Sequence, residues 1–270
     1  MSVMVTPAPG RALRTARSLR DWIPAAVIFV LGIGLWEGLT KALHVQQFLL
    51  PAPSEIVSTL YDQRSVLWGA GWYTFKEALG GFVIGSGAAI GFAILVSRFS
   101  RLGNALMPVA IAANAIPIIA FAPIFNAWFD PLTPTAKMAV AAVLCFFPVL
   151  VNTLRGLQSV QPEQIELMRS YACGELQTFR RVRFPTALPY IFTALKVASV
   201  LAMIGAIVGE FFGGSFNALG VLIRSRAQIL DFDSAWAAIL VACVFGIGFY
   251  LAVAAAERLV VRWGPSTREA

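Results

Sequence analysis

A polar and basic segment, ELMRSYACGELQTFRRVRFPTALP from Glu166 to Pro189, lies between two long apolar stretches of the sequence. Its carboxylates and guanidinium groups can contact another protein or the phosphates of lipid headgroups. Catalysis would need a clustered nucleophile, general base or set of metal ligands, whereas the chain has one histidine, His44, and three isolated cysteines. The chemistry that this segment offers is therefore recognition of a partner.

The other reactive residue types indicate the same. Cys145, Cys173 and Cys243 fall in different parts of the chain, so we expect no disulfide, and His44 has no cluster of ligands around it, so we expect no metal site. The sequence has no Gly-x-x-x-x-Gly-Lys-Ser/Thr phosphate loop, so the chain has no visible means of hydrolysing ATP by itself. We predict a protein that is not an enzyme and holds no cofactor.

The composition indicates a protein that spans a membrane. Hydrophobic residues make up 58% of the chain and charged residues 13%, whereas a soluble domain carries about a quarter charged residues. Backbone groups in lipid must be satisfied within their own segment, and no stretch alternates like a barrel strand, so we expect helices of ~20 residues. Six apolar segments are long enough, at about Trp22–Leu43, Trp72–Val96, Leu102–Phe129, Thr135–Leu154, Ala187–Phe212 and Ala235–Val260.

The basic residues orient these spans. With six spans, one side receives Arg11, Arg14, Arg17, Arg20, Arg98, Arg101, Arg155, Arg169, Arg180, Arg181, Arg183, Arg258, Arg262 and Arg268. The other side receives only Lys41, Arg64, Lys76, Lys137, Arg224 and Arg226. The positive-inside rule then places both termini and the polar segment in the cytoplasm, with the chain in the inner or plasma membrane. Topology and anionic lipids explain the net charge of +7, so no nucleic-acid partner is expected.

The second apolar segment is rich in glycine. Gly81 with Gly85 and Gly87 with Gly91 have the small-xxx-small spacing that predicts close packing between helices. The run from Gly85 to Gly91 looks superficially like a dinucleotide-binding loop. However, it has one residue too many and no strand before it, so we predict packing rather than binding.

Polar residues inside spans are candidates for a transport path, because they are costly in lipid and usually face a cavity or a partner helix. The candidates are Asn114, Pro117, Asn126 and Glu210. The first three lie in the third segment, where proline interrupts the helix and frees backbone carbonyls. Glu210 lies near the outer end of the fifth segment. It could line the path, pair with an arginine of the following loop, or reach interfacial water.

The polar segment resembles the cytoplasmic coupling loop, the "EAA" loop, of the permease subunits of binding-protein-dependent ABC importers. Glu166 takes the first position of that pattern, and matching intervals separate it from Phe179, Arg181, Val182, Phe184 and Pro185. Leu167 and Met168 replace two small residues of the pattern, and Ala172 stands where the pattern has glycine, with Gly174 two places later. The resemblance extends over roughly residues 70–262.

This resemblance implies an all-helical integral membrane protein with six transmembrane helices in the MetI-like ABC permease fold. It divides the chain into a basic cytoplasmic tail (1–21), a permease domain (22–262) with its core at about 70–262 and its coupling loop at 156–186, and a second cytoplasmic tail (263–270). The partners that it implies are ABC ATPase subunits, a substrate-binding protein, a second permease copy in a homodimer, and membrane lipids.

The resemblance also implies how the loop acts. A helix from about Pro162 to Cys173, followed by a turn near Gly174, forms a rigid knob that fits a cleft of the ATPase. The implied coupling residues are Glu166, Arg169, Ser170, Tyr171, Ala172, Gly174, Phe179 and Pro185. Two prolines, Pro185 and Pro189, mark where the loop re-enters the membrane. The alternative is an amphipathic helix resting on the inner leaflet, with its arginines on lipid phosphates.

Two outer segments resemble the same family. The stretch 48–60, with two prolines, predicts a short helix on the outer surface with Ser54 as its N-cap. The stretch Leu219–Ile223 resembles a family segment that forms part of the outer gate, where a binding protein docks. Glu37 and Lys41 are one helical turn apart, which predicts a local ion pair.

The substrate has two interpretations. The pattern as a whole resembles nitrate, sulfonate and taurine permeases, but Asn114–Pro117 with Glu210–Gly214 resembles the branch associated with thiamine-pyrimidine precursors and riboflavin. An anion site needs basic groups, and the spans offer Lys196 and little else. We expect a small vitamin-related heterocycle moved inward by alternating access, with sulfonate, taurine or nitrate as the alternative. An ATP-independent carrier or channel would predict buried charge pairs or inverted repeats, and we identify neither in the sequence.

Overall fold

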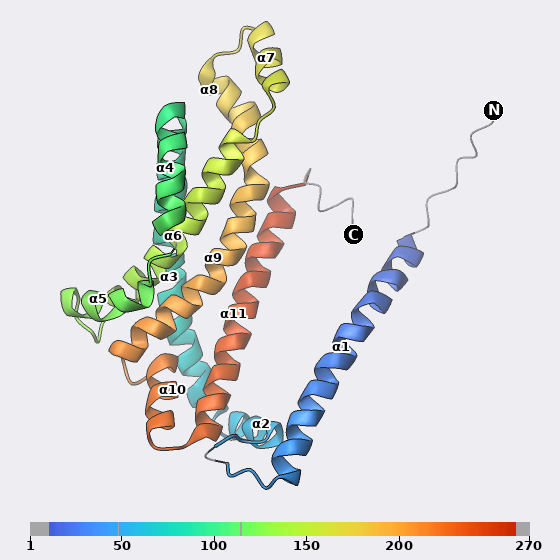
Figure 1. The fold of residues 1–270 in the computed structure, drawn as a ribbon, viewed down its shortest axis with the longest axis vertical. Coiled ribbons are helices and arrows are strands. Elements are labelled where there is room, and N and C mark those ends of the chain that lie inside the picture. Colours follow the sequence, from blue (N-terminus) through green and yellow to red (C-terminus); the bar gives the residue numbers. More distant parts are fainter. Residues whose placement is uncertain (1–10, 48, 114, 263–270) are drawn as a thin grey trace, which may run out of the picture.

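The computed structural model describes residues 11–47, 49–113 and 115–262, which form an elongated helical bundle (Figure 1). The described residues contain no strand, which confirms the predicted all-helical class. The elements are α1 (Arg11–Ala42), α2 (Pro53–Asp62), α3 (Arg64–Ser97), α4 (Ser100–Ala113), η1 (Ile118–Phe121), α5 (Ala122–Trp128), α6 (Pro134–Gln158), α7 (Pro162–Ser170), α8 (Glu175–Thr178), η2 (Phe179–Arg183), α9 (Phe184–Phe212), α10 (Leu219–Gln228) and α11 (Phe232–Val260).

Five stretches of helix are long and apolar enough to cross a membrane within the described part of the chain. They lie in α1, in α3, in α6, in the continuous helix Glu175–Phe212 made by α8, η2 and α9, and in α11. Each coincides with one of the predicted spans. The predicted spans therefore correspond to helices, each of which begins before the apolar limit read from the sequence.

The third predicted span is divided instead of continuous. α4 ends at Ala113, and the chain then forms the short η1 and α5, with α5 lying across the direction of α4 (Figure 1). Pro117 lies in the break, and Pro123 takes an early position in α5. Proline lacks an N–H and restricts the residue before it, so the two prolines account for the interruption that the sequence predicted.

The core lies where α3, α6 and α9 pack together. A side chain at Gly85 would collide with the backbone oxygen of Ala142, and one at Gly81 would meet the Cβ of Ala141. The packing prediction is confirmed for this pair, since only glycine allows the backbones to come so close. A methyl group at Gly87 or Gly91 would have nothing within 4 Å, so within this chain the same prediction is wrong for these two glycines.

The first helix stands apart from the bundle (Figure 1). Only 6% of its most apolar window is buried. It contacts the other helices near its C-terminal end. There the ring of Trp36 packs against the ring of Trp236 in α11, with their centroids 5.4 Å apart. The short helices α2 and α10 lie near this end of the molecule, and α7 and α8 lie at the opposite end (Figure 1).

Candidate functional sites at the two ends of the bundle

The connection between α6 and α9 projects beyond the bundle as two short helices (Figure 1). Gln161 has an extended backbone, with φ −68° and ψ 141°, and Pro162 opens α7, where its fixed φ suits the first helical turn. No residue of α7 is buried. Four predicted coupling residues lie on or directly after this helix and are exposed: Glu166, Arg169, Ser170 and Tyr171.

A Schellman motif ends α7. The N–H of Ala172 donates to the carbonyl of Arg169 at 2.9 Å, and the N–H of Cys173 donates to the carbonyl of Met168 at 3.0 Å. Ala172 has φ 52°, the left-handed conformation that glycine adopts without steric cost. This explains why the coupling-loop pattern has glycine at this position. Because the motif closes the helix at Ser170, the predicted helix to Cys173 is three residues too long.

The predicted turn near Gly174 is formed two residues earlier, and Gly174 itself takes no part in it. Gly174 has an extended backbone, with φ −69° and ψ 167°, and precedes α8. Its N–H donates to Oε1 of Gln177 at 3.3 Å, and its carbonyl accepts from the hydroxyl of Thr178 at 3.1 Å. The left-handed turn lies at Ala172 instead, because that residue completes the Schellman motif.

The second half of the loop is anchored to the bundle. Phe179 packs against the main hydrophobic core, and its ring centroid lies 6.1 Å from that of Phe184. The helix is wider than an α-helix over Phe179–Arg183, directly before Pro185. Pro185 has no N–H for the carbonyl of Arg181, so a π-type turn accommodates its ring. The helix then continues through Pro185 and Pro189 to Phe212, so the loop is joined rigidly to a spanning helix.

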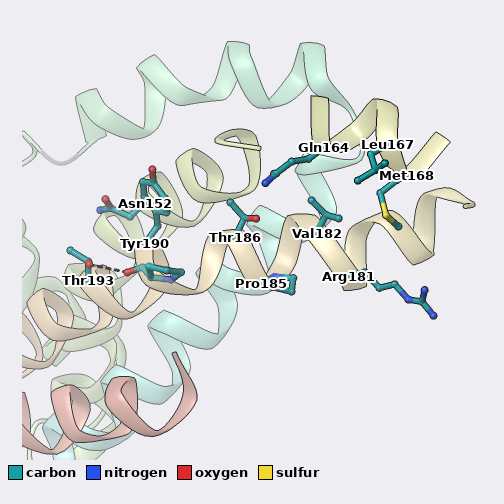
Figure 2. Close-up of a pocket in the computed structure, with 11 residues that line it drawn as sticks. Asn152, Gln164, Leu167, Met168, Arg181, Val182, Pro185, Thr186, Tyr190 and Thr193 are labelled. Carbon is teal, nitrogen blue, oxygen red and sulfur yellow. Dashed lines mark hydrogen bonds between the residues drawn. The ribbon is translucent and has the colours of Figure 1, made fainter. Parts of the chain in front are cut away.

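A cavity of about 870 Å³ separates α7 from the neighbouring ends of α6 and α9 (Figure 2). Leu167 and Met168 face Val182 across it, while Asn152, Tyr190 and Thr193 lie at the other end (Figure 2). Its lining is Asn152, Gln164, Leu167, Met168, Arg181, Val182, Pro185, Thr186, Pro189, Tyr190 and Thr193. The space leaves α7 free of the bundle on one face, so α7 can contact a partner without first unpacking the core.

Glu210, at the other end of the bundle, is fully buried. The Thr74 hydroxyl donates to its Oε1 at 2.7 Å, and the N–H of Gly220 donates to its Oε2 at 2.6 Å. The N–H of Leu219 donates in turn to the Thr74 hydroxyl at 3.0 Å. The carboxylate thus satisfies an otherwise unpaired N–H in the first turn of α10 and joins α3, α9 and α10.

The arginines that follow Glu210 have other partners. Arg224 donates to the carbonyl of Phe211 at 2.5 Å, and Arg226 pairs with Asp231 at 3.2 Å. Of the three alternatives for Glu210, an ion pair with one of these arginines is therefore not formed. Burial also keeps its carboxylate from interfacial water in this structure.

Two further ionisable side chains are buried beside Glu210: Glu77 of α3 and Lys137 of α6. The carboxyl of Glu77 interacts with Glu210 and with Lys137. The ammonium of Lys137 donates to the carbonyls of Pro131 and Thr133. A lysine expected among the outer surface charges is thus wholly buried, because the first turn of α6 packs against α9.

Sequence reasoning did not single out Thr74 or Glu77. A signal was present, because Thr74, Glu77, Gly81 and Gly85 recur at three- and four-residue intervals and so share one face of α3. Polar residues on the same helix face as closely packed glycines lie in a helix–helix interface. The spacing of Thr74 and Glu77 with Gly81 and Gly85 would therefore have predicted that both side chains lie inside the bundle.

The other path candidates lie near this cluster or at the break in the third segment. Asn126 is 8% exposed, and its Nδ2 donates to the carbonyl of Gly209 at 3.1 Å. Pro117 is exposed, and Asn114 lies outside the described residues. The structure brings Asn126 and Glu210 to the same region, while their role in transport stays a prediction.

Lys196, the basic residue that the sequence placed within a span, is paired. Its Nζ lies 2.7 Å from Oε2 of Glu257, which joins α9 to α11, and both side chains are largely buried. Sequence reasoning identified no buried charge pair, and this pair corrects that statement. Because the carboxylate neutralises it, Lys196 is not a free cation for an anionic solute.

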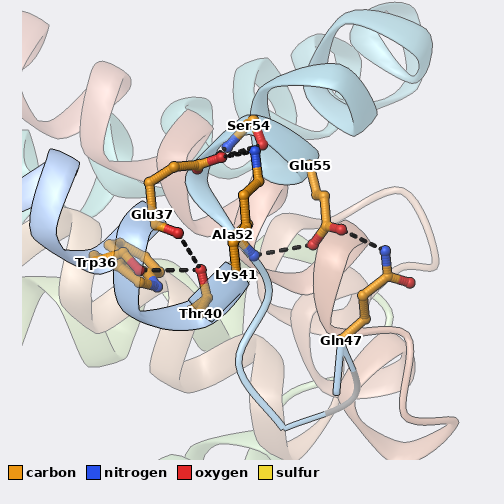
Figure 3. A network of polar contacts seen from close by, with 8 residues as sticks. All are labelled: Trp36, Glu37, Thr40, Lys41, Gln47, Ala52, Ser54 and Glu55. Atoms are coloured by element: carbon orange, nitrogen blue, oxygen red, sulfur yellow. Dashed lines mark hydrogen bonds and ion pairs between the residues drawn. The ribbon is translucent and has the colours of Figure 1, made fainter. Parts of the chain in front are cut away.

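A second polar network fastens the end of α1 to α2 (Figure 3). Glu37 forms the predicted ion pair with Lys41, which confirms that prediction, and it also accepts from the N–H and hydroxyl of Ser54 at 3.0 and 2.7 Å. Ser54 is therefore not the N-cap of α2. That position belongs to Ala52, whose N–H donates to Oε2 of Glu55 at 3.0 Å.

Spanning helices with an exposed helical loop at one end define a class: a multi-pass membrane transport subunit. The chain belongs to the family described as "Binding-protein-dependent transport system inner membrane component", which matches residues 81–262. It is an ABC importer permease of the inner membrane. It is not itself an enzyme, because ATP is hydrolysed by a separate subunit.

Several curated proteins are similar over most of the chain. The riboflavin transport system permease protein RibX of Chloroflexus aurantiacus is 31% identical over 242 residues, covering 89% of this chain and 90% of its own. The formylaminopyrimidine transport permease protein ThiX of Halalkalibacterium halodurans is 32% identical over 242 residues, covering 88% and 94%. A putative aliphatic sulfonates permease, SsuC of Bacillus subtilis, is 26% identical over 252 residues, covering 93% and 91%.

Among solved structures, the chain is similar to one titled "Crystal structure of an amino acid ABC transporter with histidines". The TM-score is 0.59 at 18% identity, over 74% of this chain and 96% of the other. At this identity the likeness supports the fold alone. It agrees with the predicted MetI-like architecture of the permease core.

Proposed function

We propose that this permease imports a small heterocyclic solute of the riboflavin or thiamine-pyrimidine-precursor class. The observation that carries the proposal is the pairing of Lys196 with Glu257, which neutralises this cation, while the ammonium of the buried Lys137 is held by the carbonyls of Pro131 and Thr133. The similarity to the riboflavin and formylaminopyrimidine permeases, at 31% and 32% identity, supports the same class. Aliphatic sulfonates, taurine or nitrate are the second candidates, because permeases with those descriptions are 23% to 26% identical.

We further propose that α7 is the knob that docks in a cleft of the ATPase. None of its residues is buried, it begins at a proline, and a Schellman motif fixes its end. Contact would be made by the exposed Glu166, Arg169, Ser170 and Tyr171, with Ala172 holding the turn. Gly174, Phe179 and Pro185 connect this knob to the bundle. The coupling loop is thus residues 156–186 within a permease domain of 22–262.

The continuous helix Glu175–Phe212 connects the coupling loop at one end of the bundle to α10 at the other end. It begins beside α7, and its last turn carries Glu210, whose carboxylate accepts the N–H of Gly220 in the first turn of α10. A displacement of α7 by closing ATPase subunits would move this helix, because it runs without a break from α8 to Phe212. The cluster of Thr74, Glu77 and Glu210 would then transmit the motion to the outer helices, where we place the docking of a binding protein.

We propose that two copies of the chain enclose the transport path and that both termini lie in the cytoplasm. A single bundle of this size is too small to enclose a path alone, so a second copy completes it. The concentration of arginine on the side of the loop supports the orientation. Alternating access by such a dimer uses ATP binding to open the path outward and hydrolysis to reset it.

The proposal is tested by the ATPase activity of the permease reconstituted with its cognate ATPase and binding protein. Riboflavin and formylaminopyrimidine are compared with taurine, an alkanesulfonate and nitrate. Stimulation by a heterocycle alone supports the proposed substrate class. Stimulation by a sulfonate or nitrate alone transfers the assignment to the second candidates and leaves the importer mechanism intact.

A further inference from the structure

A second cavity, of about 460 Å³, lies between the end of α3 and the coupling loop. Three arginines from three different parts of the chain line it: Arg98 directly after α3, Arg169 of α7 and Arg183 of η2. The rest of the lining is Ile94, Ser97, Ile165, Cys173, Glu175, Leu176, Thr178 and Phe179. The fold therefore gathers separate cations around one space, and only one of them lies on the predicted knob.

The cavity has an excess of positive charge. Its lining contains three guanidinium groups and a single carboxylate, that of Glu175. Among the described residues, none of the three guanidinium groups forms an ion pair, since the pairs found there involve Lys41, Lys196 and Arg226. Unpaired guanidinium groups that converge on one space bind an anion with several oxygens, such as a phosphate, in bidentate fashion.

Apolar side chains lie beside the same arginines. Leu95 is 62% exposed and Phe99 is 61% exposed, one on each side of Arg98 in the chain, while Leu176 in the lining is 64% exposed. Arg98 is also the first residue after α3, a helix apolar enough to cross the bilayer. Cations at the end of a span with exposed apolar groups around them match the boundary between headgroup and acyl chain.

We propose that this cavity binds the headgroup phosphate of an anionic phospholipid, with Arg98, Arg169 and Arg183 on the phosphate and the acyl chains along Leu95 and Phe99. A free phosphate would use the guanidinium groups but would leave the apolar groups without an occupant, which favours the lipid. The bound lipid would connect the end of α3 to both halves of the coupling loop. It would therefore brace the loop against the membrane surface.

The experiment uses the purified full-length permease in detergent. Native mass spectrometry measures the phospholipid retained, and thermal unfolding is followed with added phosphatidylglycerol, phosphatidylcholine or inorganic phosphate. The variants are Arg98→Gln and Arg183→Gln, neither of which is among the coupling residues. Arg155→Gln is the matched control. Arg155 is an exposed arginine near the C-terminal end of α6, close to the coupling loop, and it lines neither cavity.

The wild type and Arg155→Gln should retain phosphatidylglycerol and be stabilised by it more than by phosphatidylcholine. Each pocket variant should bind it roughly fivefold more weakly, the effect of one arginine near an anionic surface. Equal retention in all variants would overturn the proposal. Equal stabilisation by inorganic phosphate would assign the site to a free anion.

Discussion

The hydroxyl of Thr74 in α3 lies 2.7 Å from Oε1 of Glu210 in α9 and also accepts the N–H of Leu219 in α10 at 3.0 Å. One small side chain thus closes a hydrogen-bonded junction between three helices that are distant in sequence. Both Thr74 and Glu210 are wholly buried, so no water can replace a lost partner.

Thr74→Val should destabilise the protein by about 1 to 3 kcal/mol, because it keeps the shape of the side chain and removes a partner from both Glu210 and the Leu219 N–H. Thermal unfolding in detergent measures the loss. Thr193→Val is the control, since the exposed Thr193 hydroxyl donates only to the Pro189 carbonyl within its own helix. Equal unfolding temperatures for the two variants would contradict the junction.

Gly85→Ala and Gly87→Ala form a matched pair within α3. The first places a methyl group against the backbone of Ala142, and the second places it in open space. We expect Gly85→Ala to lower the stability by about 1 to 3 kcal/mol, the cost of overpacking, and Gly87→Ala to cause no loss. Unfolding temperature and the yield of folded protein check this. A reversed order would show that α3 and α6 do not approach as described.

Ala172→Gly should stabilise the coupling loop. Alanine at φ 52° carries a steric cost of about 1 to 2 kcal/mol, part of which is offset by the greater freedom of glycine in the unfolded chain. The net gain should be about 0.5 to 1 kcal/mol. Hydrogen exchange at the amides of Ala172 and Cys173, which close the Schellman motif, should slow. Faster exchange would place the turn elsewhere.

Lys196 and Glu257 should behave as a coupled pair. Lys196→Met leaves a largely buried carboxylate without its partner and should cost about 3 kcal/mol. The double variant Lys196→Met with Glu257→Gln should recover most of that loss, because no buried charge remains. Thermal unfolding of the wild type, both single variants and the double variant measures the stabilities that the double-mutant cycle compares. Additive losses in the double variant would show that the two groups do not interact.

Much of the fold was predictable from the sequence because a bilayer allows few solutions. Apolar segments of sufficient length must be helices, and five of the predicted spans coincide with single helical stretches. The proline pair in the third segment also predicted a break, which the structure places after Ala113. The exact left-handed residue of the coupling loop was not predictable, because a glycine is the usual sign of such a residue and here alanine occupies that position, two residues before Gly174.

The buried cluster was less predictable. Lys137 and Glu77 look like boundary charges when each is considered within its own helix. Only the packing of α6 and α9 against α3 encloses them, and that contact depends on glycine and alanine pairs far apart in the sequence. The partner of Lys196 was also not predictable, because Glu257 lies 61 residues further along the chain and only the packing of α9 against α11 brings the two together.

The most direct test of the central claim, that α7 couples this permease to its ATPase, is co-purification of the ATPase with Glu166→Lys and Ala172→Trp variants, together with solute uptake by the reconstituted complexes. Both variants should insert as the wild type does and keep the packed bundle, since the two positions are exposed. We predict that both lose ATPase association or hydrolyse ATP without uptake. Asp62→Lys, a charge reversal at the exposed end of α2, should keep ATPase association. Normal association and uptake in the two loop variants would contradict the coupling role.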